Sequence, residues 1–202
     1  MPGSGTYFKY HPQEGFAGKR VLNIGCGFTQ FKAPNVVNLD AFDICKPDVV
    51  HNLEKMPLPF KENEFDLIIA NHILEHVKGW WNVVSECARI LKPGGVLEIW
   101  VPGDGSDAQR GYRDHVVTIN DHSFSGITMA NGRNSGNAWF EAGKVKAKWT
   151  DRLRLVNVVR HLVPRWYIRL APRFIQQFML EHFRNIIAEN GYFLVKKTVG
   201  EE

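Results

Sequence analysis

The stretch VLNIGCG at residues 21–27 decides the fold of this chain, because it has the pattern of a buried strand that runs directly into a glycine turn. Glycines at positions 25 and 27 allow the backbone to turn tightly and to approach a ligand closely. A second strand, NVVNL at residues 35–39, follows and ends at Asp40. Because α/β sheets bind ligands at the carboxyl ends of parallel strands, this pair predicts both a parallel sheet and a binding site.

The same alternation continues through the first half of the chain. Further strands are predicted at residues 48–50, 65–70 and 95–101, and a helix at 80–91 that is ended by PGG at 93–95. Only residues 28–35 separate the glycine turn from the second strand. Since a parallel crossover normally needs about a dozen residues or more, this first crossover is predicted to be a turn instead of a helix. Strands alternating with helices predict an α/β fold with right-handed crossovers.

The second half of the chain has a less regular pattern. Residues 103–137 are rich in Gly, Asn, Asp and Ser and predict a long lid or binding loop, with one short strand near 116–118. The elements expected beyond it are a strand at 144–149, a helix at 150–162, a helix at 174–187 ended by Asn190-Gly191, and a strand at 192–199. Residues 1–18 are predicted to form an irregular N-terminal arm.

Length and composition predict one globular domain over residues 1–202. The mean hydropathy is -0.25, and no apolar run approaches the ~18 residues of a membrane-spanning helix. The first residues lack the basic-then-apolar pattern of a secretory signal. The three cysteines, Cys26, Cys45 and Cys87, form no CxxC pair, which argues against a disulfide framework and a four-cysteine zinc site. A reducing, cytoplasmic location is therefore expected.

The glycine motif indicates what kind of ligand would bind. Dinucleotide-binding enzymes use Gly-x-Gly-x-x-Gly, but here the third glycine is replaced by Gln30, so no clear pyrophosphate cradle is present. Asp40 ends the second strand, where a carboxylate can accept hydrogen bonds from both hydroxyls of a ribose. The two features together predict a site for a nucleoside without a pyrophosphate.

These motifs belong to a longer ordered set. They are followed by DVVHNL at 48–53, MPLPF at 56–60, NEFDLIIANHILEH at 63–76 and RILKPGG at 89–95. With this set the chain resembles the class I S-adenosylmethionine-dependent methyltransferases, and within them the small branch found in glycan-synthesis and phage gene clusters. The resemblance covers residues 20–101. It implies a Rossmann-like, mostly parallel twisted sheet of about seven strands with helices on both faces, a reduced first crossover helix and irregular C-terminal additions.

The resemblance also implies S-adenosyl-L-methionine as the cofactor and assigns residues to it. Residues 19–102 would form the cofactor-binding half, and residues 103–202 the acceptor side. The backbone of Gly25, Cys26 and Gly27 would pass under the amino-acid part of the cofactor. Asp40 would hold the ribose, with Ala41 beside it.

The remaining implied contacts come from later in the chain. Asn52 and Leu53 would flank the adenine, and Asn71 and His72 would face the methionine portion. Two positions depart from the family pattern: Asn23 stands where many members carry an acidic residue, and Asn52 replaces a frequent Asp. An amide at position 52 can still donate and accept hydrogen bonds.

A competing motif overlaps this set. HILEH at residues 72–76 matches H-x-x-E-H, an inverted zinc-protease signature with both histidines on one helical face and Glu141 as the candidate third ligand. Its position directly after a buried strand favours an interpretation without metal, as a network at a helix start in which Glu75 lies near the positive end of the helix dipole.

Methyl transfer from a sulfonium is a displacement reaction, for which the protein must orient the donor and the acceptor. A general base is needed only when the acceptor is a poor nucleophile. The candidate bases lie in the loop after the fifth strand. His115 and His122 rank first because imidazole titrates near neutrality, and Asp114 and Asp121 come second.

Charge is distributed unevenly along the chain. Residues 1–102 carry 10 basic and 11 acidic side chains, whereas residues 103–202 carry 15 and 10. Nine basic residues lie within residues 144–173 with one acidic residue, Asp151, and aromatic residues are interleaved among them. This segment predicts contact with an anionic small molecule or glycan; an anionic membrane surface and nucleic acid are the alternatives.

A non-catalytic protein that binds the cofactor or nucleic acid is the main alternative to an enzyme, because methyl transfer has no universal catalytic residue.

Overall fold

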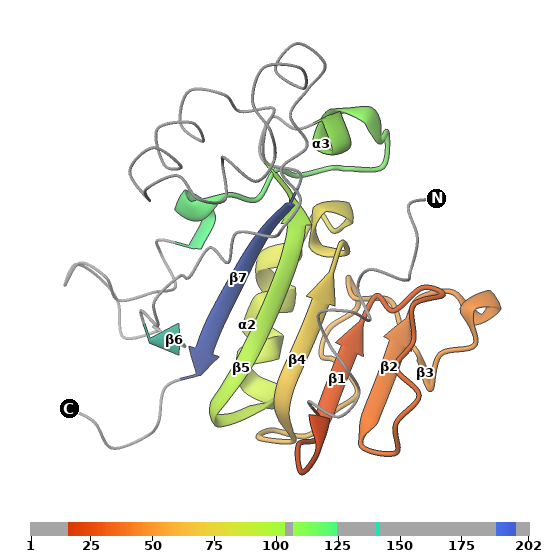
Figure 1. The fold of residues 1–202 in the computed structure, drawn as a ribbon, viewed down its shortest axis with the longest axis vertical. Coiled ribbons are helices and arrows are strands. Elements are labelled where there is room, and N and C mark those ends of the chain that lie inside the picture. Colours follow the sequence, from red (N-terminus) through yellow and green to blue (C-terminus); the bar gives the residue numbers. More distant parts are fainter. Residues whose placement is uncertain (1–15, 104–106, 125–139, 142–188, 197–202) are drawn as a thin grey trace, which may run out of the picture.

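The fold is seen in a computed structural model that describes residues 16–103, 107–124, 140–141 and 189–196 (Figure 1). Seven strands form one sheet in the order β3-β2-β1-β4-β5-β7-β6. The strands are β1 (Val21–Ile24), β2 (Val36–Asp40), β3 (Val49–Val50), β4 (Phe65–Asn71), β5 (Leu91–Pro102), β6 (Phe140–Glu141) and β7 (Glu189–Lys196). The predicted sheet of about seven strands is confirmed.

The first five strands are parallel, and β7 and then β6 are added at one edge by antiparallel pairing. β1 pairs with β2 on one side and with β4 on the other, whereas β7 runs antiparallel to β5. The chain therefore builds outward from β1 to β3 and then continues on the opposite side of β1 with β4. This reversal creates a topological switch point at the carboxyl ends of β1 and β4, the place where open α/β sheets bind ligands.

One face of the sheet is covered by α2 (Trp80–Ile90), which lies behind β4 and β5 (Figure 1). Its buried positions, Val83, Val84, Cys87 and Ile90, follow the spacing of one helical stripe. They pack against alternate residues of the strands, such as Leu22, Ile68 and Leu97, all fully buried. Period 3.6 in the helix and period 2 in the strands thus produce the main hydrophobic core.

The opposite face near β1 and β2 is covered without a helix. Residues 25–35, which connect these strands, contain turns and extended backbone, so the prediction of a reduced first crossover is confirmed. The ring of Phe31 packs edge-on against Phe16, with centroids 5.0 Å apart. Both rings are buried together with Val21, Val36 and Ile69. Two aromatic side chains therefore cover apolar surface that a crossover helix would otherwise cover.

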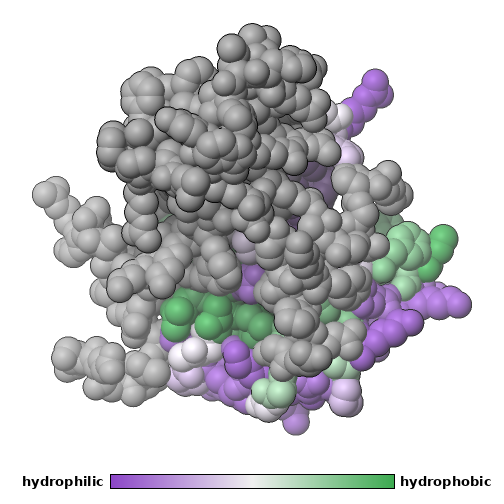
Figure 2. Space-filling model, viewed as in Figure 1, coloured by the Kyte–Doolittle hydropathy of each residue, from purple (hydrophilic) through white to green (hydrophobic). Residues whose placement is uncertain are grey.

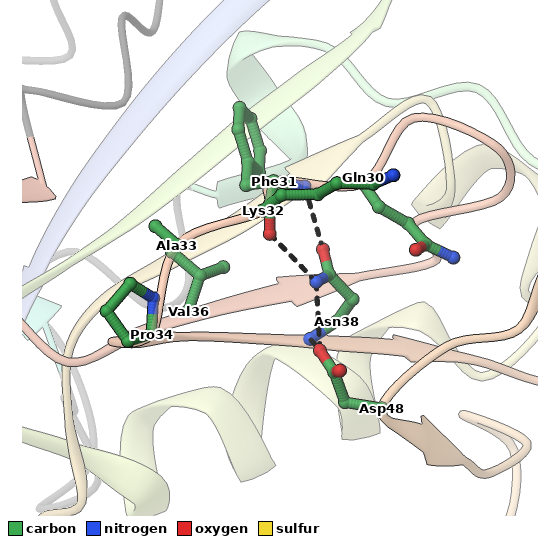
Figure 3. Close-up of a pocket in the computed structure, with 8 residues that line it drawn as sticks. All are labelled: Gln30, Phe31, Lys32, Ala33, Pro34, Val36, Asn38 and Asp48. Atoms are coloured by element: carbon green, nitrogen blue, oxygen red, sulfur yellow. Dashed lines mark hydrogen bonds between the residues drawn. The ribbon is translucent and has the colours of Figure 1, made fainter.

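A buried polar network holds this connection in place (Figure 3). The side-chain oxygen of Asn38 accepts hydrogen bonds from Nδ2 of Asn23 and from the backbone N–H of Phe31, each at 3.1 Å. Nδ2 of Asn38 donates to the carbonyl oxygen of Phe31 at 3.1 Å and to Oδ2 of Asp48 at 2.9 Å. The side chain of Asn38 thus uses all of its hydrogen-bond donors and acceptors. These bonds hold the segment between β1 and β2 in place, although it has no regular secondary structure.

Three element predictions need correction. The strand predicted to begin at residue 95 begins at Leu91, directly after the helix, because the fully buried Leu91 already pairs with Phe65. No strand forms at residues 116–118; the N–H groups of Val116 and Val117 instead donate to the carbonyl oxygen of Glu75, at 2.8 and 3.3 Å. This segment therefore crosses the ends of the strands.

The third correction concerns the C-terminal strand. Asn190 and Gly191, predicted to end a helix, lie within β7, where Gly191 pairs with Trp100 of β5. A Cβ on Gly191 would lie 2.7 Å from the indole of Trp100, so packing against this ring explains the glycine. β7 therefore begins three residues before the predicted strand at residue 192.

Several predictions fall on residues that the structure does not describe. They are residues 1–15 of the arm, the strand at 144–149, the helices at 150–162 and 174–187, and the basic segment 144–173. Among the described helices, the longest is α2 with 11 residues, and none has the length and apolar character needed to cross a membrane.

Candidate functional site

The glycine turn after β1 is shaped by close packing on one side and open space on the other. Gly25 has φ of 62° and Gly27 has φ of 50°, a left-handed backbone that favours glycine. A Cβ on Gly25 would clash with the side chain of Ile73, whereas a Cβ on Gly27 would have no heavy atom within 4 Å. Gly25 is thus required by packing, and Gly27 leaves room for a ligand.

Asp40, at the carboxyl end of β2, lies beside this turn. Its carboxylate is 7% exposed. Oδ2 accepts a hydrogen bond from the N–H of Gly27 at 2.8 Å, and Oδ1 accepts one from the N–H of Phe42 at 3.0 Å. A carboxylate oxygen can accept two hydrogen bonds, so each oxygen keeps one position for a ligand hydroxyl.

A cavity of about 220 Å³ opens at the switch point of the sheet. Its lining residues come from the end of β1, the glycine turn and the end of β4: Asn23, Gly25, Cys26, Gly27, Phe28, Thr29, Asn71 and His72. Five of the residues predicted to bind the cofactor therefore lie around one space. A second cavity of about 390 Å³ lies along the first crossover and is lined by Phe31, Asn38, Asp48 and their neighbours (Figure 3).

The other predicted cofactor residues lie beyond β2 and β3. Ala41 is exposed directly after Asp40. Oδ1 of Asn52 accepts the N–H of Glu54 at 2.8 Å and so closes a turn, whereas the side chain of Leu53 belongs to the main core at 5% exposure. Asn23, at the position where many family members are acidic, points to Asn38 and is 2% exposed. Its side-chain amide thus stabilises the crossover.

The space-filling view has a hydrophobic patch at the edge of the molecule where β2 and β3 lie (Figure 2). The exposed apolar side chains of this part of the chain are Phe42, at 69% exposure, Ile44, at 78%, and Val50. Phe42 donates its backbone N–H to Asp40, so this apolar surface begins next to the buried carboxylate. Such a surface suits the flat ring system of a nucleoside.

His72 and Glu75 form a pair that the sequence interpretation missed. His72 directly follows β4 and has φ of 51°, and its Nδ1 lies 3.2 Å from Oε1 of Glu75. Glu75 is 1% exposed and lies in the 3-10 helix η3 (Leu74–His76). The signal in the sequence was the HILEH motif, whose spacing was interpreted as that of an α-helix.

The two predicted bases lie in the segment after β5. His115 follows α3 (Asp107–Gly111) and stacks on Tyr112, with ring centroids 5.2 Å apart. Its Nδ1 lies 3.3 Å from the carbonyl oxygen of Gln109. His122 falls within η4 (Asp121–Phe124), and its side chain lies outside the described residues. His115 lines neither of the two cavities described above.

The thiol of Cys26 shares the electrostatic environment of Asp40. Burial, followed by the nearby negative charge of Asp40, raises the pKa of Cys26 to about 12. The thiol is therefore neutral at physiological pH and is a packing group of the cavity, not a nucleophile. All three cysteines of the chain are free.

Comparison with known proteins agrees with this geometry. Residues 22–99 match the family model described as a methyltransferase domain. A sterol 24-C-methyltransferase of Schizosaccharomyces pombe is 34% identical over 114 residues, covering 45% of this chain and 30% of that protein. A ubiquinone biosynthesis O-methyltransferase of Dechloromonas aromatica is 32% identical over 103 residues, covering 39% of this chain and 42% of that protein. The chain thus spans less than half the length of these relatives.

A solved structure extends the likeness to the whole fold. A SAM-dependent methyltransferase from Archaeoglobus fulgidus superimposes with a TM-score of 0.66 at 17% identity, covering 96% of this chain and 92% of that chain. The matched stretch contains the glycine turn and the end of β4, which line the cavity, and Asp40, which is hydrogen-bonded to that turn. Residues 22–99 are therefore similar to a methyltransferase domain, and the chain shares its fold with a SAM-dependent methyltransferase.

Proposed function

We propose that this protein is an enzyme that transfers a methyl group from S-adenosylmethionine to a hydroxyl or amino group of a small-molecule or glycan-like acceptor. The observation that carries the proposal is the buried carboxylate of Asp40, which is hydrogen-bonded to the glycine turn at the switch point of the sheet. This arrangement supports a ribose site at the place where α/β folds bind nucleosides.

The residues of the cavity and the neighbouring Asp40 fit this cofactor. Each oxygen of Asp40 holds one backbone N–H and keeps a position for one ribose hydroxyl. The open space at Gly27 allows a ligand to lie against the backbone, and Asn71 and His72 supply polar side chains at the end of β4. When bound, S-adenosylmethionine supplies a methyl group on a positively charged sulfur, which makes that methyl group electrophilic.

For a hydroxyl acceptor, His72 is the proposed general base. It lines the cavity, and its ring is oriented by a contact of 3.2 Å between Nδ1 and Oε1 of Glu75. An imidazole at this place can accept the proton of an acceptor hydroxyl. Glu75 would act as the positioning residue, because a buried carboxylate fixes both the tautomer and the orientation of the ring. The roles of His115 and His122 as bases stay predictions from the sequence.

The acceptor is proposed from the charge distribution. The methyl donor would occupy the first half of the chain. The second half carries an excess of basic residues, 15 against 10 acidic ones. An anionic small molecule or a glycan carrying acidic groups would be attracted to this half. Contact of residues 144–173 with a membrane surface and binding of nucleic acid are the alternatives. The three free thiols support a reducing, cytoplasmic location.

Calorimetric titration with S-adenosylmethionine tests the donor site. Asp40→Asn keeps the shape of the side chain but removes its charge, and its affinity should fall about 10- to 100-fold, as expected for hydrogen bonds to a charged group. Asp43→Asn, on the exposed η2 turn (Asp43–Cys45), is the matched control and should bind as the unaltered protein does. Failure of the unaltered protein to bind, or equal binding by Asp40→Asn, would falsify the donor site.

A methyl-transfer screen over small molecules, acidic glycans and oligonucleotides tests the reaction. The radiolabelled methyl group should appear on an acceptor, and His72→Asn should lower kcat by about 10²-fold or more, a larger factor than its effect on donor affinity. Asparagine is chosen because it tolerates the left-handed backbone of position 72. Donor binding without transfer to any acceptor class would favour the non-catalytic alternative.

A further inference from the structure

A cluster of three potential metal ligands lies beside the cavity, formed by residues that are distant in the sequence. Glu75 and His76 belong to η3, directly after β4, and His115 comes from the segment that follows α3. One ligand atom from each of the three lies within 4.8 Å of the other two. The rings of His76 and His115 meet edge-on with centroids 4.8 Å apart.

The hydrogen bonds of the two histidines determine which nitrogen can bind a ligand. Nδ1 of His76 lies 3.1 Å from the carbonyl oxygen of Asp114. Nδ1 of His115 lies 3.3 Å from the carbonyl oxygen of Gln109. A carbonyl oxygen can only accept, so each Nδ1 would be the donor, and in the neutral form of the ring Nε2 is then the nitrogen that can bind a metal. Metal-binding histidines are commonly held in this way, with the second ring nitrogen donating to a carbonyl.

Glu75 supplies a buried carboxylate that lacks a full set of partners. Oε1 lies 3.2 Å from Nδ1 of His72, whereas Oε2 is buried and has no hydrogen-bond partner. Among the described residues, no lysine or arginine forms an ion pair with this carboxylate. A buried carboxylate oxygen without a partner is unfavourable, and a cation would relieve it.

We propose that Glu75, His76 and His115 bind one divalent transition-metal ion of the Zn²⁺ type. Two imidazoles and one carboxylate are a ligand set that zinc accepts in its tetrahedral sites, with the fourth position left for water or a substrate oxygen. Ligands at about 2.0–2.1 Å from such an ion lie about 3.3 Å from one another. The cluster is wider than this, so binding draws the three side chains together.

This site differs from the zinc motif considered from the sequence. That motif places His72 and His76 on one face of an α-helix, but residues 74–76 form a 3-10 helix that begins after an extended strand. His72 contacts Glu75 and lines the cavity, while His115, 39 residues from His76 in the chain, completes the cluster. His115 would thereby be a metal ligand and no longer available as a free base.

The ion would join two parts of the site. The N–H groups of Val116 and Val117 already donate to the carbonyl oxygen of Glu75, and a metal would add a second link between this segment and η3. Glu75 would bridge the ion on Oε2 and His72 on Oε1, and so connect the ion to the cavity. The proposal does not rest on methyl transfer, because it concerns binding of the ion alone.

Metal titration of the full-length chain, purified without a histidine tag and treated with a chelator, tests the site. Zn²⁺ should bind one per chain with a Kd of micromolar or below and should raise the Tm. Co²⁺ in its place should give the intense visible absorption of tetrahedral coordination without a thiolate charge-transfer band. Absence of stoichiometric Zn²⁺ binding, or a thiolate band, would overturn the proposal.

Three variants separate this ligand set from other sites. His115→Ala and Glu75→Gln should each weaken Zn²⁺ binding at least 100-fold and abolish the metal-dependent rise in Tm. His51→Ala, which removes an imidazole that pairs with the carbonyl oxygen of Lys55 outside the cluster, should bind Zn²⁺ as the unaltered protein does. Glu75→Gln should leave the Tm of the metal-free protein unchanged or higher, because it replaces a buried carboxylate in which Oε2 has no hydrogen-bond partner. Unaltered Zn²⁺ affinity in His115→Ala would rule out the proposed ligand set, even if Glu75→Gln failed to fold.

Discussion

The backbone N–H of Gly27 donates a hydrogen bond of 2.8 Å to Oδ2 of Asp40. This contact joins the two features that the sequence placed at the ends of neighbouring strands, and it orients the carboxylate before any ligand binds. Because Gly27 also has open space where a side chain would be, the turn provides both a hydrogen-bond donor for Asp40 and room for the ligand. The two glycines of this turn can therefore be distinguished experimentally.

Alanine should affect stability more at position 25 and ligand binding more at position 27. Gly25→Ala should lower the free energy of unfolding by about 2–4 kcal/mol, because it adds a clash with Ile73 to the cost of a left-handed backbone. Gly27→Ala should lower it by only about 1–2 kcal/mol. Relative to this loss of stability, however, Gly27→Ala should weaken S-adenosylmethionine binding more than Gly25→Ala does. Urea unfolding and calorimetric titration measure the two effects. Similar loss of stability in both variants would contradict the distinction.

The network around Asn38 should be essential for the helix-free crossover. Asn38→Ala removes four side-chain hydrogen bonds in a buried region and leaves donors and acceptors of Asn23 and Phe31 without partners. We expect a loss of about 2–4 kcal/mol in the free energy of unfolding. Hydrogen exchange at residues 28–35 should also become faster.

The exposed Asn82 on α2 provides the control for this prediction. Asn82→Ala should change the free energy of unfolding by less than about 0.5 kcal/mol, as expected for a surface site. If Asn38→Ala were equally mild, the packing of Phe16 and Phe31 alone would suffice to hold the crossover.

Acid should weaken the hydrogen bonds that join Glu86 of α2 to the loop before β4. Hydrogen bonds from Arg89 hold the pKa of Glu86 below its ordinary value, and Glu86 also accepts the N–H of Leu58 at 3.0 Å. Because the pKa is lower in the folded than in the unfolded protein, the stabilisation is complete above the unfolded pKa of about 4.5 and is lost as the pH falls through the folded pKa.

Glu86→Gln is the variant that measures this effect. At pH 7 it should lower the free energy of unfolding by about 1–2 kcal/mol, as expected for charge-assisted hydrogen bonds, and the difference should shrink below pH ~4. Denaturant melts at a series of pH values would record it, with the exposed Glu54→Gln as the control. A difference that stayed constant down to pH ~3 would exclude the proposed linkage.

Thiol labelling should report the environment of Cys26. With its pKa raised from 9.0 to about 12, the thiolate fraction at pH 8 is about a thousand-fold lower than that of an ordinary cysteine. Alkylation of the folded protein, followed by peptide mapping, should therefore label the half-buried Cys45 well before Cys26 and the fully buried Cys87. Early labelling of Cys26 would contradict this electrostatic environment.

Local patterns in the sequence predicted most of the parallel sheet. The strands at 21–24 and 36–40 could be identified because their apolar residues continue until a glycine or a carboxylate interrupts them. The shortness of the first crossover was also readable, since too few residues remain for a helix. These features depend on neighbours in the chain, so no tertiary contact is needed to infer them.

Features that depend on distant residues were not predictable in the same way. Gly191 has the pattern of a helix end, and only its contact with Trp100 of β5 explains its place in a strand. Val116 and Val117 have the pattern of a strand, but their N–H groups donate to Glu75. In both cases a contact across the fold outweighs local preference.

Short, ordered stretches of the chain were enough to predict the class of fold, the glycine turn and the carboxylate at Asp40, and by resemblance a methyl-donor site. Only the tertiary structure decided that Asn23 and Asn38 stabilise a helix-free crossover and that Glu75 stands between His72 and the pair His76 and His115. The physical reason is that side-chain partnership depends on the folded path, which brings together residues about 40 positions apart at the ends of β4 and β5.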